Sequence, residues 1–145
     1  MSQVLPAAQG LPAMSRDDVA HVAQLQDYLL QLPQVEIETI HHLHAGLYAR
    51  TIRIPAGVVI TGALIRIPTL LILSGHATVF IGGESMELAG YHVLPGQAGR
   101  KQVFRAHADT DLSMLFATSA ATVEEAEAEF THESDLLASR RPRKE

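Results

Sequence analysis

Three of the eight histidines in the chain stand together in the segment His41-His42-Leu43-His44. Side chains alternate between the two faces of a strand, so a strand here would place His42 and His44 on one face. Two imidazoles on one face are a possible pair of ligands for a transition metal. No third ligand is near in the sequence, and the other histidines are scattered: they are His21, His76, His92, His107 and His132. The pattern therefore favours surface or hydrogen-bonded histidines over a metal site.

A serine stands close to a histidine in Ser74-Gly75-His76, which raises the question of nucleophilic catalysis. These residues fit a turn between strands and lack the strand-to-helix elbow that presents a catalytic serine. The chain has no cysteine, so it has no thiolate nucleophile and no thiolate zinc site. Gly82-Gly83 fits a two-residue hairpin, and no glycine pattern for phosphate binding is present. The sequence therefore offers no pattern for nucleophilic catalysis and none for a phosphate-bearing cofactor.

Arg50 and Arg53 lie three residues apart, so a strand through both would direct them to opposite faces. One of them could be a buried guanidinium that holds a carboxylate ligand. Arginine is rarely buried, which favours solvent exposure or pairing with an acid on a neighbouring strand. The candidate acids are Glu36, Glu38 and Glu87.

The composition bounds the possible partners. The chain has 145 residues, of which 47% are hydrophobic, enough for one compact domain with a buried core. A formal net charge of −5 argues against a nucleic-acid binder, because neutralising phosphates requires a basic face. Residues 1–10 lack the positive start and apolar run of a secretory signal. No apolar run reaches the roughly 18 residues that cross a bilayer. We therefore expect a soluble protein of the cytoplasm with no nucleic-acid or membrane partner.

The first third of the chain contains two different segments before the strands begin. Residues 1–14 are poor in charge and contain two prolines and a glycine, so we expect an extended arm. Residues 15–32 are predicted to form a helix, because Ser15 is followed by acids in the first turn and by apolar residues at helical spacing. Pro33 ends that pattern.

The residues from 35 to 118 are predicted to form about eight or nine short strands. Glycine and proline interrupt them at short intervals, as in GLYARTIRIPAGVVITGALIRIPTLLILSGH at 46–76. A second capping box, Thr122 with Glu125, opens a short acidic helix, and the region 122–145 closes with a basic tail. An all-β sandwich or barrel with helical ends is the fold class this order indicates.

The block 46–118 resembles the cupin-like jelly roll, especially the small single-domain versions found in tailed-phage genomes. The matching elements are turns and short strands: they are His41-His42 with Gly46 to Arg50, Ile54-Pro55-Ala56-Gly57, Gly62, Leu70 to Gly75, Gly99-Arg100-Lys101, and His107 with Asp109. The resemblance covers about half of the chain and implies a fold rather than a chemistry.

Cupins that use a metal hold it with histidines inside the barrel. When the chain is lined up on Gly62 and Leu70, the corresponding positions contain Ile65 and Thr69. Isoleucine has no lone pair, and a single threonine hydroxyl is a poor ligand for a transition metal. The glutamate ligand expected before Gly75 is missing as well. We therefore expect no metal-dependent cupin reaction and no stoichiometric transition metal in the isolated protein.

Among the phage versions, the chain is similar to the jelly-roll cement proteins that decorate capsids, in its length, its added termini and its alanine- and arginine-rich composition. That resemblance implies a non-enzymatic homodimer, assembled in the host cytoplasm, that ties subunits of the major capsid protein together on the outer surface of the virion. The two ends would be docking strips whose truncation leaves thermal stability nearly unchanged. The predicted partner contacts are Val4, Leu5, Leu11, Arg140, Arg141, Arg143 and Lys144.

Two alternatives stay open, a metal-free cupin that binds or isomerises a small molecule such as a sugar, and a generic interaction domain. A barrel centre of Ile65, Ile67, Leu71 and Leu73 would be filled by its own side chains and leave little room for a polar ligand. The chain has no tryptophan and three tyrosines, which also argues against a sugar, because sugar platforms use aromatic faces. Nothing in the sequence separates a capsid cement from a generic interaction domain.

Overall fold

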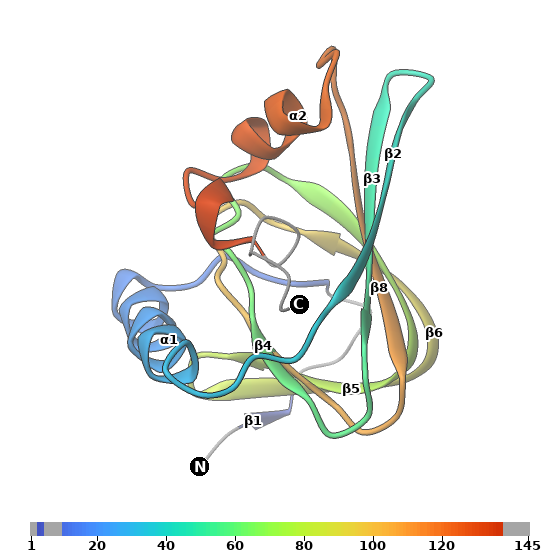
Figure 1. Cartoon of the computed structure of the whole chain (residues 1–145). Helices are drawn as coiled ribbons and strands as arrows, with labels where there is room; N and C mark the ends of the chain where they lie inside the picture. Colours follow the sequence, from blue (N-terminus) through green and yellow to red (C-terminus); the bar gives the residue numbers. More distant parts are fainter. Residues whose placement is uncertain (1–2, 5–9, 138–145) are drawn as a thin grey trace.

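The structure is a computed structural model that describes residues 3–4 and 10–137. Its main element is an eight-stranded sheet that curls into a half-open barrel, with the helices gathered on the open side (Figure 1). The strand order is β1-β6-β5-β8-β3-β2, and off this path β4 pairs with β7, which also pairs with β5. The predicted all-β, cupin-like jelly roll with about eight or nine strands is confirmed.

The element bounds are as follows. The strands are β1 (Gln3–Val4), β2 (Glu38–His44), β3 (Leu47–Ile54), β4 (Val59–Thr61), β5 (Thr69–Ile81), β6 (Glu84–Gly96), β7 (Val103–Ala106) and β8 (Thr110–Ala117). The helices are α1 (Arg16–Leu29), α2 (Val123–Phe130) and the 3-10 turn η2 (Ser134–Leu136). Every strand pairing is antiparallel except that of β1 with β6. Among the described residues, no helix is long and apolar enough to cross a membrane.

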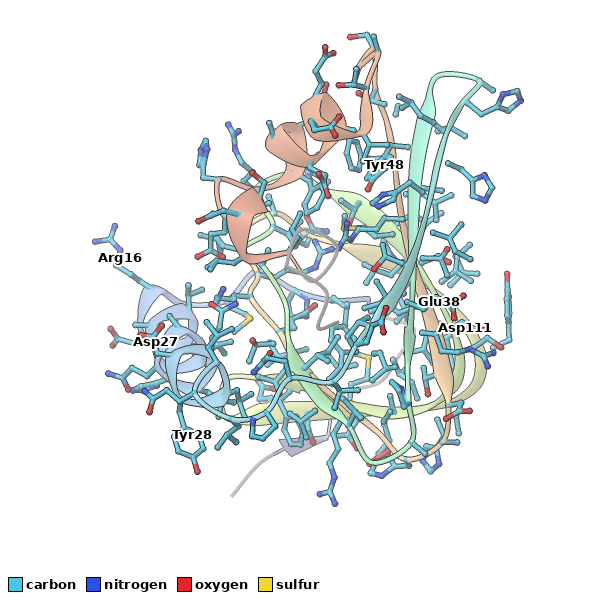
Figure 2. The ribbon with its side chains drawn as sticks, in the orientation of Figure 1. Arg16, Asp27, Tyr28, Glu38, Tyr48 and Asp111 are labelled. Atoms are coloured by element: carbon cyan, nitrogen blue, oxygen red, sulfur yellow. The ribbon has the colours of Figure 1, made fainter. Side chains whose placement is uncertain are left out.

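Helix α1 is fixed at its start by Ser15, whose Oγ accepts a hydrogen bond from the Asp18 N–H at 3.0 Å. This cap satisfies one of the donors that the first helical turn leaves free. Val22 and Gln26 are the buried residues of the helix, so one face packs on the barrel. Asp27 and Tyr28 project from the opposite side (Figure 2).

The core has two parts. The larger part is formed mainly by residues of β5 and β6, and its fully buried members include Ile54, Leu73, Val79, Met86 and Leu88. The smaller part lies under α2 and is aromatic. The Tyr48 ring lies 5.5 Å from Phe116 and 6.4 Å from Phe130, centroid to centroid, so β3, β8 and α2 meet at one cluster. Aromatic contacts of this kind stabilise beyond the area they bury.

Leu11 corrects the expectation that residues 1–14 are only a docking arm. Its side chain is 1% exposed and belongs to the larger core. Its N–H donates to the Pro95 carbonyl and its carbonyl accepts from the Gln97 N–H, both at 2.9 Å. An extended segment can pair with these free backbone groups at the end of β6, and its leucine then fills the core. Leu11 is therefore not a surface contact for a partner.

Of the other predicted partner contacts, only Val4 lies among the described residues. Val4 lies in β1, opposite Ser85 of β6 in a parallel pairing. The remaining predicted contacts are Leu5, Arg140, Arg141, Arg143 and Lys144, and they lie outside the described residues.

Candidate functional site

A cavity of about 410 Å³ lies inside the curl of the sheet, under α1 and the segment after α2. Its size falls in the range of small-molecule pockets. Six apolar side chains from the sheet and its connecting segments form much of the wall: they are Ile52, Ile65, Leu71, Phe104, Leu112 and Met114. On the helical side, exposed Leu30, Leu32 and Val35 line the cavity. The site is therefore mainly apolar.

The cavity corrects the expectation that the barrel centre is filled. Ile65 and Leu71 line the space, whereas Leu73 packs into the larger core and Ile67 packs against the aromatic cluster. The curvature of the sheet separates these four residues from one another, and residues of the helices complete the cavity wall. Strand periodicity does not define that curvature, so the sequence did not indicate the space.

Four buried polar side chains also line the cavity: they are Gln26 of α1, Arg50, Arg100 and Gln102. Arg50 belongs to β3. Arg100 and Gln102 belong to the extended segment that leads into β7, and both line the cavity together with Phe104. Residues two apart on an extended segment point to the same side. This explains why Arg100, Gln102 and Phe104 line the cavity, whereas Lys101 and Val103, which are also buried, do not.

Arg50 is 8% exposed and forms an ion pair with Glu127 of α2, with 3.1 Å between Nη1 and Oε2. The sequence favoured exposure, or pairing with Glu36, Glu38 or Glu87, and that interpretation is wrong for Arg50. The partner lies 77 residues away, on a helix that folds back over the open side of the sheet. Arg53, on the opposite face, is exposed and pairs with Asp111 at 3.0 Å.

Arg100 is 1% exposed, and its partners are neutral. Its guanidinium donates to the Gln97 carbonyl and to the Thr69 hydroxyl, each at 2.5 Å. It packs on the backbone of Gly96, where an added Cβ would lie 2.6 Å from Arg100 Cζ. No carboxylate of the described residues lies within ion-pair distance, and Nε has no acceptor among them. Burial lowers the pKa of Arg100 to about 10, so the group stays charged at neutral pH.

Lys101, the next residue, shows the usual solution for a buried cation. Its Nζ lies 2.8 Å from Glu133 Oε1, which also accepts from the Leu64 N–H. Burial raises the pKa of Glu133, but these hydrogen bonds and the attraction of Lys101 outweigh it and hold the pKa below its ordinary value. Of Arg50, Arg100 and Lys101, Arg100 alone has no carboxylate partner among the described residues.

Gln102 adds a second unsatisfied donor to the same wall. The side chain is 4% exposed, and its Nε2 has no acceptor in the described part of the chain. Buried donors are nearly always paired in folded proteins, so each unpaired donor calls for an explanation. Arg100 and Gln102 both belong to the lining of the apolar cavity, although the unpaired Nε and Nε2 atoms themselves have almost no accessible surface.

Groups that could carry out catalysis are absent from this wall. Among the described lining residues there is no histidine, cysteine, aspartate, glutamate, serine, lysine or tyrosine. This set offers no general base and no ligands for a transition metal. The residues in the barrel therefore do not fit the metal site of metal-dependent cupins.

The predicted histidine pair does not form a site. His42 and His44 are exposed on β2, and neither belongs to a potential metal-binding group among the described residues. His41 faces inward and its Nδ1 lies 2.8 Å from the Tyr48 hydroxyl. Burial, with a smaller contribution from the nearby Arg50 charge, lowers the pKa of His41.

Sequence reasoning did not identify Arg100 or Gln102 as site residues. Gly99-Arg100-Lys101 entered only as a turn in the resemblance. The available signal was the order Arg100, Gln102, Phe104 just before a strand, which places two polar side chains and one aromatic side chain on one side.

Comparison with family models and with curated proteins gives no match. Solved structures that share the fold include two cupin-type proteins. One is the salicylate 1,2-dioxygenase of Pseudaminobacter salicylatoxidans, which aligns with a TM-score of 0.53 and 16% sequence identity. The aligned part covers 79% of this chain and 35% of the enzyme's chain. A cupin superfamily protein of Desulfitobacterium hafniense aligns with a TM-score of 0.50 and 13% identity over 63% of this chain and 86% of its own length.

These neighbours are cupin-superfamily proteins, and they agree with a cupin-like jelly roll. At such low identity the likeness concerns the fold alone. One neighbour is an enzyme, so the expectation that this chain is not an enzyme stays a prediction. The capsid-cement part of the resemblance also stays a prediction.

Proposed function

We propose that this cupin-like protein binds a small, mainly apolar carboxylate in the barrel cavity, with Arg100 as the anion-binding residue. One observation carries the proposal: a buried arginine, which is one of the residues that line the apolar cavity, has no carboxylate partner in the described part of the chain. A buried charge is unfavourable until an opposite charge and hydrogen bonds compensate it. A ligand carboxylate would supply both.

The chemistry of the wall narrows the ligand class. A guanidinium presents its donors in a planar fork that matches a carboxylate, and Gln102 offers a further N–H. Leu71, Phe104 and Leu112 would contact the apolar body of the ligand. A sugar would leave many hydroxyls without partners on such a wall, which is unfavourable. No general base is present among the described lining residues, so the function proposed is binding.

The test measures whether the negative charge of a ligand is recognised. Isothermal titration calorimetry would compare 2-naphthoate with its neutral isostere 2-naphthamide and with glucose. A hydrogen-bonded charge contributes about 1.5–3 kcal/mol, so the acid should bind about 10–100 times more tightly than the amide. Glucose should not bind.

Two matched variants test whether Arg100 is the residue that causes the preference for the acid over the amide. Arg100→Gln should remove the preference for the acid, whereas Arg53→Gln, which removes an exposed arginine on the outer face, should leave it unchanged. Equal affinities of acid and amide for the wild-type protein, or an unchanged preference in Arg100→Gln, would show that the proposal is wrong.

A second candidate function is the capsid cement, as a homodimer on the outer surface of a virion with the major capsid protein as partner. The observation that favours it is a set of exposed apolar side chains on β2, β3, β5 and β6: they are Ile40, Leu47, Leu70, Tyr91 and Val93. Such surfaces are typical of protein contacts. Light scattering would test for the dimer, and mass spectrometry of purified virions would test for the capsid role. A protein that is monomeric and absent from virions would exclude this candidate.

A further inference from the structure

The surface of the sheet on the side away from the cavity brings together His76, Glu87 and His107. They come from β5, from β6 and from the residue after β7, and they lie far apart in sequence. Each offers one ligand atom, and these atoms lie within 4.8 Å of one another. Two imidazoles and one carboxylate are a common ligand set for zinc.

Strand pairing holds these three residues in place. Thr78 of β5 is opposite Glu87 on β6 and opposite Arg105 on β7, so the three strands run side by side at this point. The His107 N–H donates to the His76 carbonyl at 2.8 Å, which fixes the two histidine backbones against each other. The ligand atoms are therefore carried by hydrogen-bonded sheet rather than by long loops.

Gly75 allows this close approach. An added Cβ at Gly75 would lie 2.7 Å from the Thr110 Cα and 2.8 Å from the Asp109 carbonyl oxygen, closer than any side chain can be. The Thr110 hydroxyl also accepts from the His76 N–H at 3.1 Å. The turn before β8 thus packs directly on β5 and brings His107 to His76.

The distances are close to those of a metal site. His76 Nε2 lies 3.6 Å from Glu87 Oε2, and His107 Nε2 lies 3.7 Å from Glu87 Oε1. The two imidazole centroids are 4.6 Å apart. Zinc–ligand bonds of about 2.0–2.1 Å in a tetrahedron place ligand atoms roughly 3.4 Å apart. Rotations of exposed side chains suffice to close the difference.

We propose that His76, Glu87 and His107 form a binding site for Zn²⁺, with water in the fourth position. The side chains are about one-third to one-half exposed, so a metal can reach them and little desolvation opposes binding. The Thr78 hydroxyl donates to Glu87 Oε1 at 2.5 Å and also lies 2.7 Å from His107 Nε2. Metal binding would replace the contact with His107 Nε2 and keep the hydrogen bond that orients the carboxylate. Such outer partners typically raise metal affinity about 10–100-fold. The bound ion would link the β5–β6 hairpin to the turn between β7 and β8.

The proposal is independent of ligand binding in the cavity and is an alternative to the expectation that the isolated protein holds no transition metal. That expectation rested on Ile65 and Thr69 inside the barrel and treated His76 and His107 as scattered. Imidazole ligands favour zinc and its neighbours in the transition series over Mg²⁺ or Ca²⁺.

The experiment is calorimetric titration of untagged, chelator-treated protein with ZnCl₂, and with MgCl₂ as the control ion. We expect one Zn²⁺ per chain, no Mg²⁺ binding, and a rise in melting temperature when Zn²⁺ is present. Glu87→Gln and the double variant His76→Gln/His107→Gln should weaken Zn²⁺ binding more than tenfold. Thr78→Val should weaken it about tenfold.

The matched control is the double variant His42→Gln/His44→Gln, which removes the same number of exposed histidines from β2. It should bind Zn²⁺ like the wild-type protein. Circular dichroism of each variant shows that its fold is retained. The absence of saturable one-to-one binding in the wild-type protein, or an equal loss in the β2 control, would overturn the proposal.

Discussion

The two arginines in the cavity wall occupy contrasting environments. Arg50 stands on a strand of the sheet and meets Glu127 from a helix that covers the barrel. Arg100 stands on an extended segment packed on Gly96, and only a carbonyl and a hydroxyl receive its hydrogen bonds among the described residues. Both are buried, so burial alone does not distinguish their roles.

Because both arginines are buried, we infer that the balance of charge, not the depth of burial, distinguishes the structural role of Arg50 from the proposed binding role of Arg100. The Arg50 ion pair is complete without any ligand and ties α2 to β3. Arg100 has a local scaffold but no counter-charge, as expected of a group prepared for an anion. The predictions below test this contrast, beginning with the largest effect.

The largest loss of stability is expected from Arg50→Met, which removes the positive charge from the buried ion pair with Glu127. Breaking a buried ion pair from one side costs about 3–5 kcal/mol of the free energy of unfolding. Urea unfolding followed by circular dichroism measures it. The double variant Arg50→Met/Glu127→Leu should recover most of the loss, because both charges are then removed. A loss below 1 kcal/mol in the single variant would contradict a structural role for this pair.

The second-largest loss of stability is expected from Leu11→Ala, which tests the backbone contacts that hold the Arg100 side chain in place. Leu11 bonds to Pro95 and Gln97, and Gln97 supplies the carbonyl that accepts from Arg100. A buried leucine truncated to alanine costs about 2–5 kcal/mol. The control is Leu30→Ala at an exposed position, which should change stability little. An unchanged free energy of unfolding in Leu11→Ala would restore the view that residues 1–14 are only a docking arm.

Glu133→Gln should lower the free energy of unfolding by a smaller amount, and the size of this loss should depend on pH. The folded pKa of Glu133 lies below its ordinary value of 4.5, so the unfolded chain binds the proton first as the pH falls. The stabilisation by the Lys101 pair is therefore present above pH 4.5 and is lost as the pH drops through the folded pKa. We expect wild-type stability to decline more steeply than that of Glu133→Gln in this window, measured by urea unfolding at several pH values. Parallel declines would contradict the prediction.

The smallest change in stability is expected for Arg100→Met. The variant loses two hydrogen bonds, worth about 1 kcal/mol each, but it also removes a buried charge that no carboxylate compensates. The free energy of unfolding should stay within about 1 kcal/mol of wild type, while anion binding disappears. If Arg100→Met destabilised as much as Arg50→Met, the two arginines would both be structural and the contrast would fail.

The sequence by itself determined the fold class and several local features. Alternating apolar residues and closely spaced glycine and proline turns predicted a β barrel with helical ends, because strand periodicity and turn chemistry are local properties. Ser15 was recognised as a helix start for the same reason: the Asp18 N–H it accepts from lies three residues away. The separation of Arg50 and Arg53 onto opposite faces followed from strand geometry.

Only the tertiary structure decided where charge is balanced and where space remains. The partner of Arg50 lies 77 residues along the chain, and no local pattern links the two. Leu11 joined the core because the end of β6 offered free backbone groups. The cavity beside Arg100 depends on the curvature of the sheet, and the cluster of His76, Glu87 and His107 depends on the register of three strands. Curvature and register arise from packing among distant residues, and a single sequence does not display them.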